Sequence, residues 1–342
     1  MSAQLRTLAI LALLILSGCV SASEDAYKSL AEIASTQRRP EGSVLVRIFK
    51  EESELEVWRL GADGKYAMAK TFPLCRWSGK LGPKKKIGDR QAPEGFYTVT
   101  ASLLNPNSKY HRSFNLGYPN PLETSLGYTG DALMVHGACS SAGCFAMTDA
   151  AVGEVYAMVS GALASGQSDF QVQAYPFRMT PAAMARHRFD PNMAFWKNLK
   201  LGYDIFEATR REPKVGACGG RYVFDAEPAV PGATIAANAA CPVLKAKVDP
   251  QVAAKRARDS VQLQALLEAG KGGTTSAYAD GGMHPRFRDM LKQLGADGLA
   301  KQTSETAVQI SRPDAALADP YTPPAPAEAA PAKPAESAVA SQ

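Results

Sequence analysis

The sequence has little excess of charge of either sign, few histidines and no internal repeat. Its 38 Lys and Arg against 33 Asp and Glu leave a net charge of +5, which is too mild to indicate a nucleic-acid-binding protein. The densest basic run, residues 84–86, is typical of a solvated loop. The absence of a period of about 20 to 50 residues excludes solenoids and propellers. We therefore expect no nucleic-acid partner and no repeat architecture.

Long apolar runs are also missing after the N-terminus, which excludes a protein with many membrane spans. Hydrophobic residues nevertheless make up 46% of the 342 residues. That share is enough for a buried core in one large domain or in two ordinary ones.

Residues 1–18 have the pattern of a signal peptide, with a positive charge at Arg6 and an apolar stretch over residues 8–16. The stretch is shorter than the roughly 20 residues of a spanning helix. Because residues 16–19 resemble a bacterial lipobox, we expect a lipidated Cys19 and a tether over residues 19–40; simple cleavage nearby is the alternative. The protein would then be periplasmic and lipid-anchored to a membrane. Val20 after the cysteine favours the outer membrane.

The next part of the chain reads as a sheet-built domain over residues 41–180. Short β-rich runs bounded by turn residues predict strands at 44–49, 55–60, 96–100, 131–136 and 170–175. One helix interrupts them. It begins near Thr148 or Asp149, and its apolar residues recur at intervals of three and four from Val152 to Leu163.

The remaining third of the chain is less regular. We expect a helical extension over residues 181–225, then an accessory, partly helical segment over 226–312 with helices at 251–269 and 285–294. Residues 313–342 are mostly Ala, Pro, Glu and Ser without an apolar face. This composition predicts a disordered tail.

One short segment carries a pattern typical of thiol chemistry. The strand at 131–136 ends on His136, and a loop of small residues leads to Cys144. A thiol with a pKa of about 8.5 is a weak nucleophile at neutral pH, so it needs a neighbouring base such as an imidazole. We therefore predict Cys144 as nucleophile and His136 as its base. The backbone N–H groups of Gly143 and Cys144 are the candidate oxyanion hole.

Two other interpretations of this segment remain open at the level of the residues. His136 could be purely structural with Cys139 and Cys144 joined in a local disulfide, or His136, Cys139 and Cys144 could be part of a zinc site. Zinc is disfavoured because His111, His187 and His284 show no ligand spacing. We expect neither a metal nor a cofactor.

The same segment resembles the signature of the YkuD-type L,D-transpeptidase family, through Val135-His136-Gly137 and Ser141-x-Gly143-Cys144. Motifs at residues 49–52, 78–84, 93–97 and 175–180 are similar to the YafK-like branch of that family. The resemblance covers roughly residues 42–225. It implies an α+β fold, with a mixed-sheet β-sandwich as the catalytic domain.

The family's chemistry is acyl transfer on peptidoglycan stem peptides. By this resemblance, Cys144 attacks the carbonyl on the L-centre of meso-diaminopimelate and forms a thioester. His136 activates the thiol and then protonates the leaving amine, and the backbone carbonyl of Gly137 orients the imidazole. An amine acceptor completes a crosslink, whereas water completes hydrolysis.

One position departs from the family pattern, because Ala146 stands where many members carry an arginine that binds a substrate carboxylate. Arg76, Lys84 and Arg112 are candidate replacements, and Ser141 is a further candidate substrate contact. The YafK-like branch shares this alanine and is associated with releasing a wall-attached outer-membrane protein. We therefore favour L,D-endopeptidase over L,D-transpeptidase activity. An inert, lipid-anchored peptidoglycan-binding module is the alternative, and a general cysteine protease has no support beyond the Cys and His.

Cysteine arithmetic adds two expectations. After Cys19 and Cys144, four of the six cysteines remain, and four allow three pairings. Pairing Cys75 with Cys139 and Cys218 with Cys241 is the economical choice. A second hypothesis is that Cys139 exchanges between that bond and Cys144 as a redox switch.

Overall fold

The computed structural model describes residues 39–246, 248–271, 273 and 276–321. The predicted signal peptide, the lipidation site Cys19 and nearly all of the tether lie outside these residues, as does the predicted tail from residue 322 onward. None of the helices within the described ranges is both long enough and apolar enough to cross a membrane.

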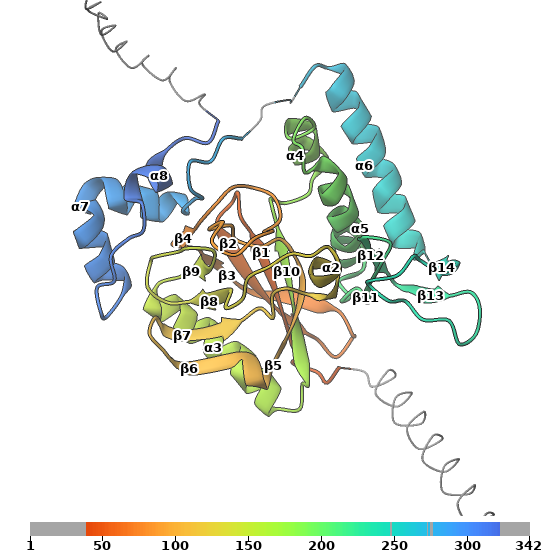
Figure 1. Cartoon of the computed structure of the whole chain (residues 1–342), viewed down its shortest axis with the longest axis horizontal. Coiled ribbons are helices and arrows are strands. Elements are labelled where there is room, and N and C mark those ends of the chain that lie inside the picture. Colours follow the sequence, from red (N-terminus) through yellow and green to blue (C-terminus); the bar gives the residue numbers. More distant parts are fainter. Residues whose placement is uncertain (1–38, 247, 272, 274–275, 322–342) are drawn as a thin grey trace, which may run out of the picture. The chain divides into compact units, whose positions relative to one another are not determined.

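The first sheet holds five strands in the order β3-β2-β1-β10-β5 (Figure 1). They are β1 (Val44–Phe49), β2 (Glu54–Leu60), β3 (Tyr66–Pro73), β5 (Gly95–Thr100) and β10 (Asp169–Tyr175). The central strand β1 runs parallel to β10 and antiparallel to β2. All of its residues are buried, because α5 (Met193–Thr209) covers one face through Phe206, which packs with Leu45, and the main core covers the other.

The second sheet has the order β4-β9-β8-β7-β6. Its strands are β4 (Arg76–Trp77), β6 (Leu104–Ser108), β7 (His111–Asn115), β8 (Met134–His136) and β9 (Phe145–Ala146), and the short helices η1 (Ala101–Leu103) and α2 (Pro121–Ser125) lie on the connections. β8 and β9 are parallel neighbours. The two mixed sheets confirm the α+β sandwich expected from the resemblance.

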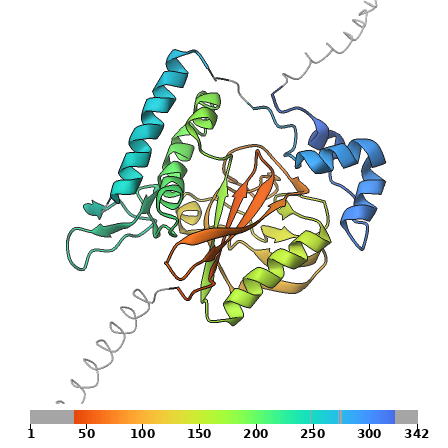
Figure 2. The ribbon, with the colours of Figure 1, turned by 180° about the vertical axis from the view of Figure 1, so that it is seen from behind.

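Helix α3 (Asp149–Ala164) adds apolar residues to the core that the two sheets share. The Thr148 hydroxyl caps it by accepting the amide hydrogen of Ala151. Val152, Val155 and Val159 are fully buried, as their spacing predicts. In Figure 2, which views the molecule from behind, α3 is the yellow-green helix. The helix packs on β7, β8, β1 and β10.

The extension after the sandwich is only partly helical. It contains α4 (Pro181–Arg186) and α5 (Met193–Thr209), but then a hairpin of β11 (Val215–Cys218) and β12 (Arg221–Phe224). The prediction of a helical segment up to residue 225 is therefore wrong at its end. Gly219 and Gly220 both adopt positive φ angles, +56° and +72°, which is the turn chemistry of a two-residue hairpin.

The accessory segment begins with a second hairpin, β13 (Ala226–Pro228) and β14 (Leu244–Ala246). The long helix α6 (Pro250–Glu268) follows and packs beside α4 and α5 (Figures 1 and 2). Its Asp249 cap accepts the amide hydrogen of Gln251. The sequence expectation for this helix agrees with the structure to within one residue at each end.

The last described elements are α7 (Pro285–Thr303) and α8 (Pro313–Leu317). Helix α7 runs past the predicted end at residue 294, with a break at Gly295. Helix α8 lies inside the predicted disordered tail, so that prediction is wrong for its first residues. The Arg288 guanidinium on α7 explains the order, because it donates to the carbonyls of Ala316, Leu317 and Ala318 at the end of α8.

A buried ion pair ties the first sheet to the loop that follows β4. Lys50 Nζ donates to Glu94 Oε1 at 2.9 Å and to the carbonyls of Gly82 and Ala92, with no side-chain exposure at either partner. Glu94 also accepts from the Gly82 amide at 2.6 Å and from Trp196 Nε1 of α5 at 2.8 Å. Burial lowers the pKa of Lys50, and the Glu94 charge opposes that shift. Removing either partner would leave the other buried without its counter-charge, so the pair contributes to stability only when it is complete.

We expect Glu94→Ala to lower the free energy of unfolding by about 3 to 5 kcal/mol, because it leaves the Lys50 ammonium buried without its counter-charge. Glu154→Ala is the matched control, since Glu154 pairs with Lys70 at the surface and such pairs contribute about 0 to 1 kcal/mol. Urea unfolding at pH 7 measures both. Equal losses in the two variants would contradict the role given to Glu94.

Candidate active site

The pairing of β8 with β9 brings His136 and Cys144 to the same side of the second sheet. The parallel register sets Val135 opposite Phe145 and His136 opposite Ala146. One step back along this register places Cys144 beside Met134, whose amide nitrogen lies 3.4 Å from Cys144 Sγ. Met134 and His136 are two residues apart on β8, so they share a face of the sheet. Cys144 and His136 are therefore diagonal neighbours on that face, and both line the same pocket.

The His136 imidazole is held in one tautomer. Its Nδ1 lies within hydrogen-bond distance of the Gly137 carbonyl oxygen, and a carbonyl only accepts, so Nδ1 carries the hydrogen. The other nitrogen, Nε2, is then unprotonated and free to act as a base. Tyr110 stacks on the ring at a centroid distance of 4.7 Å. The side chain is only 2% exposed, so both its orientation and its desolvation are imposed by the protein.

Gly137 can be no other residue in this backbone conformation. A Cβ added there would lie 2.5 Å from Asp149 Oδ1 and 2.7 Å from the Tyr110 carbonyl oxygen. Asp149 uses the same Oδ1 to accept the amide hydrogen of Ala138, at 2.8 Å, which stabilises that residue at a positive φ of +58°. The first turn of α3 thus shapes the loop that follows His136, and through its carbonyl the imidazole itself.

Cys144 lies half-buried in a pocket with a volume of about 450 Å³. Its lining includes His136, Lys84, Arg90, Tyr110, Ser141 and Ser311. Burial raises the pKa of the thiol, against the opposing effects of the Met134 amide and the Lys84 charge. Burial also lowers the pKa of His136, against the Gly137 hydrogen bond and the Asp149 charge. Both shifts favour the neutral forms, a thiol at Cys144 and an unprotonated Nε2 at His136.

The loop between the two residues is held by the Ser141 hydroxyl. It donates to the Cys144 carbonyl oxygen at 2.7 Å and lies 2.9 Å from the Ser78 hydroxyl. The Gly143 amide, one of the two groups predicted to form the oxyanion hole, donates to this same hydroxyl at 3.3 Å. In the structure, the Gly143 amide is therefore occupied by a long hydrogen bond within its own loop.

The candidate substrate-binding cations separate into one that reaches the pocket and two that do not. Lys84 lines the pocket and is only 3% exposed, with its ammonium on Asp89 and on the Lys86 carbonyl. Arg76 is fully buried and binds backbone carbonyls of residues 280–311, so the prediction of a substrate contact is wrong for it. Arg112 lines a different pocket, of about 590 Å³, and lies over the ring of Tyr156.

Several residues of the site were missed by sequence reasoning. Tyr110 and Arg90 line the pocket from two separate loops, and Ser311 reaches it from near the end of the described chain. Asp149 supports the loop from the start of α3. No local pattern marks any of them, because their partners lie far away in the sequence.

The cysteines pair as the economical choice expects, with Cys75 bonded to Cys139 and Cys218 to Cys241. Cys144 is the free cysteine of the described residues. In this structure Cys139 is bonded to Cys75, which is the state that the switch hypothesis takes as active, because the Cys144 thiol is free. The exchange of Cys139 with Cys144 stays a prediction.

The described residues offer one set with the spacing of metal ligands, formed by His111, Asp149 and Glu305, whose ligand atoms lie within 4.8 Å of one another. Both carboxylate oxygens of Asp149 already accept amide hydrogens, from Ala138 and from Glu305. Glu305 itself is exposed. These contacts give Asp149 a structural role, and a metal bound here would compete with its two amide hydrogen bonds.

A mixed two-sheet sandwich with a His/Cys pair across two parallel strands defines the class of protein, and comparison with known proteins agrees. Residues 44–172 match the model of the YkuD family, described as the L,D-transpeptidase catalytic domain. The Escherichia coli K12 protein named "Putative L,D-transpeptidase YafK" is 45% identical over 181 residues, which are 53% of this chain and 73% of the relative. The chain belongs to the YkuD-type L,D-transpeptidase family and is YafK-like, which confirms the resemblance found in the sequence.

Solved structures with partial likeness include the helical cell shape determining protein Pgp2 from Campylobacter jejuni. It is 24% identical, with a TM-score of 0.32 and coverage of 41% of this chain and 51% of that chain. Bd1075 from Bdellovibrio bacteriovorus is 14% identical, with a TM-score of 0.27 and coverage of 40% and 48%. The chain thus spans about half the length of each of these proteins.

We expect the rate at which iodoacetamide alkylates Cys144 to rise steadily from pH 6 to beyond the ordinary thiol pKa of about 8.5. Burial disfavours the thiolate and the imidazolium alike, so no ion pair supplies thiolate at low pH. Lys84→Met removes a charge that favours the thiolate. We therefore expect this variant to raise the midpoint of the alkylation-rate curve by about one pH unit or less. Peptide-level mass spectrometry reports the modified fraction.

Lys80→Met is the control for Lys84→Met, because Lys80 is an exposed lysine of the same loop. It should leave the alkylation midpoint unchanged. A wild-type rate that is already constant below pH 7 would show a preformed thiolate–imidazolium pair and contradict the neutral resting state.

Proposed function

We propose that this protein is a cysteine-nucleophile acyl-transfer enzyme that acts on peptidoglycan stem peptides. The observation that carries the proposal is the placement of His136 and Cys144 on one face of the sheet beside a pocket, in a chain of the YkuD family. The substrate bond, on the L-centre of meso-diaminopimelate, follows from the family resemblance.

The chemistry follows from the tautomer of His136. As Cys144 Sγ attacks the substrate carbonyl, Nε2 takes the thiol proton, and the Nδ1 hydrogen bond to the Gly137 carbonyl stabilises the imidazolium that forms. Collapse of the tetrahedral intermediate breaks the C–N bond, and the same proton goes to the leaving amine. The thioester that remains on Cys144 is then resolved by an amine or by water.

Two features of the pocket suit the charges of this reaction. The Cys144 amide, together with the Gly143 amide once its 3.3 Å contact to Ser141 opens, would donate to the developing oxyanion. Lys84 supplies the cation that Ala146 cannot, since it lines the same pocket as Cys144. It would attract a substrate carboxylate after exchanging part of its contact with Asp89.

Water is the acceptor that we favour, so that the enzyme would act as an L,D-endopeptidase and release a wall-attached outer-membrane protein. This choice rests on Ala146 and on the likeness to the YafK-like branch. The proposed location is the periplasm, with a lipid anchor at Cys19. Two disulfides suit such an oxidising compartment.

The test is to incubate the protein with sacculi that carry a covalently attached lipoprotein and to analyse the released fragments by mass. We expect release by the wild type and a loss of about a thousandfold or more in Cys144→Ser, because the hydroxyl is a far weaker nucleophile in the same place. Urea unfolding of Cys144→Ser verifies that the fold persists. New crosslinks instead of release would select transpeptidation, and an unchanged wall with retained binding would support the inert binding module.

A further inference from the structure

The segment of residues 278–312 lies against the loop that carries Cys144. It follows the family-matched region, which ends at residue 172, and the sequence alone assigned it to an accessory part. Its described portion forms three sets of contacts with the catalytic domain: at Ser141, at Arg90 and around the disulfide that joins Cys75 to Cys139.

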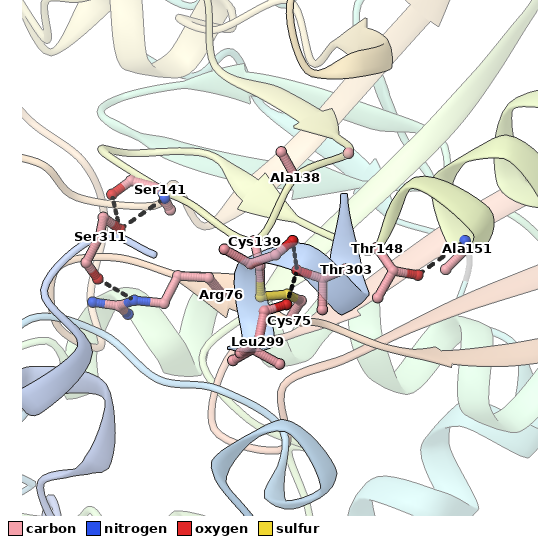
Figure 3. The surroundings of a disulfide bond; sticks show 12 residues. Cys75, Arg76, Ala138, Cys139, Ser141, Thr148, Ala151, Leu299, Thr303 and Ser311 are labelled. Atoms are coloured by element: carbon pink, nitrogen blue, oxygen red, sulfur yellow. Dashed lines mark hydrogen bonds between the residues drawn. A yellow bond between two sulfur atoms is a disulfide. The ribbon is translucent and has the colours of Figure 1, made fainter. Parts of the chain in front are cut away.

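The first contact is a reciprocal pair of hydrogen bonds between Ser311 and Ser141 (Figure 3). The Ser141 amide donates to Ser311 Oγ at 2.9 Å, and Ser311 Oγ donates to the Ser141 carbonyl at 2.9 Å. The Ser311 hydroxyl therefore pairs with both the amide and the carbonyl of Ser141. The Ser141 side chain in turn donates to the Cys144 carbonyl. Ser311 also lines the pocket.

The second contact reaches the Ser141 carbonyl through a buried carboxylate and Arg90. Asp280 is 3% exposed and accepts from Arg90 at 2.7 and 3.2 Å and from the Gly79 amide at 3.0 Å. Arg90 in turn donates to the Ser141 carbonyl at 2.9 Å. Asp280 thus orients the guanidinium that lines the pocket and binds the catalytic loop.

Arg76 anchors the segment that provides these groups. Its guanidinium donates to the backbone carbonyls of Asp280, Gly282 and Ser311, and Gly282 pairs with Trp77 as an extra bridge on the edge strand β4. A Cβ on Gly282 would lie 2.9 Å from Trp77 Nε1, so the close approach requires glycine. This explains why Arg76 is buried rather than placed in the pocket.

The third contact covers the disulfide. Cys75 and Cys139 are fully buried in an apolar cluster with α7 residues that include Phe287, Leu291 and Leu299, and Figure 3 shows Leu299 and Thr303 next to the sulfurs. Cys139 belongs to the loop between His136 and Cys144. That loop is thus fastened to the C-terminal segment at two positions, at Cys139 through packing and at Ser141 through hydrogen bonds.

We infer that the segment of residues 278–312 contributes to the active site through two of its residues, Ser311 and Asp280, which are positioning residues that hold the loop of residues 138–144. The loop needs outside support, because it consists of small residues and two of its positions, Ala138 and Gly143, adopt positive φ angles of +58° and +133°. A small displacement of an attacking atom costs a large factor in rate. This inference rests on the proposed function for its kinetic readout, but not for its structural one.

The experiment compares Ser311→Ala with Ser304→Ala in the full-length protein. Ser304 lies in the same segment, is also buried, and its hydroxyl contacts only Thr306 among the bonds described. For Ser311→Ala we expect kcat for lipoprotein release to fall about 10- to 100-fold with KM within about threefold, and amide exchange at residues 138–144 to quicken about tenfold or more. Ser304→Ala should match the wild type in all three.

Asp280→Asn and Ser311→Thr keep the inference testable if one variant fails to fold. Asp280→Asn preserves the shape but weakens the hold on Arg90, and we expect a fall in kcat of about 3- to 10-fold. Ser311→Thr retains the hydroxyl and should restore most of the activity that Ser311→Ala loses. Amide exchange and kcat in Ser311→Ala that equal those of Ser304→Ala would overturn the inference while Cys144 remains essential. If instead Cys144→Ser is as active as the wild type, the proposed function fails, and amide exchange alone still decides the positioning role.

Discussion

The parallel pairing of β8 with β9 is the constraint on which the site depends. Each strand is very short, and the connection between them is a loop of small residues rather than a helix. Because side chains alternate along a strand, a shift of one residue in the register would turn Cys144 to the opposite face from His136. The fold therefore holds this register from several directions, through β7 and β4 on either side and through the Cys75–Cys139 disulfide beneath the loop.

Burial sets the protonation of the pair that this register creates. A desolvated imidazole favours its neutral form and a desolvated thiol favours its own, so burial disfavours a thiolate–imidazolium ion pair here. The hydrogen bond from His136 Nδ1 to a backbone carbonyl takes the place that a carboxylate has in many triads. A carbonyl orients the ring without adding a full charge, so its hydrogen bond opposes but does not reverse the lowering of the His136 pKa by burial. The nearest carboxylate, Asp149, is used for the loop backbone instead.

Polar groups from distant parts of the chain complete the site. Asp280 and Ser311 act on the catalytic loop through Arg90 and Ser141, and Arg76 fixes the segment that carries them. Each group is largely buried and paired, as polar groups in a protein interior must be. The C-terminal segment and the sandwich are therefore joined by specific hydrogen bonds and not by apolar packing alone, which gives the loop a defined position.

The amino-acid sequence by itself determined β1, β2, β5 and β10 of the first sheet, the helices α3 and α6, and the choice of His136 and Cys144 as candidate site residues, because local periodicity, capping and motif spacing are properties of neighbouring residues. It did not predict β3. It did not reveal β4, β9 or α8, which are too short to leave a pattern and form only against partners remote in the chain. The burial of Arg76 and the roles of Arg90, Asp280 and Ser311 were likewise decided by tertiary structure. A charged or polar residue carries no local sign of its partner, and only the folded chain brings the two within hydrogen-bond distance.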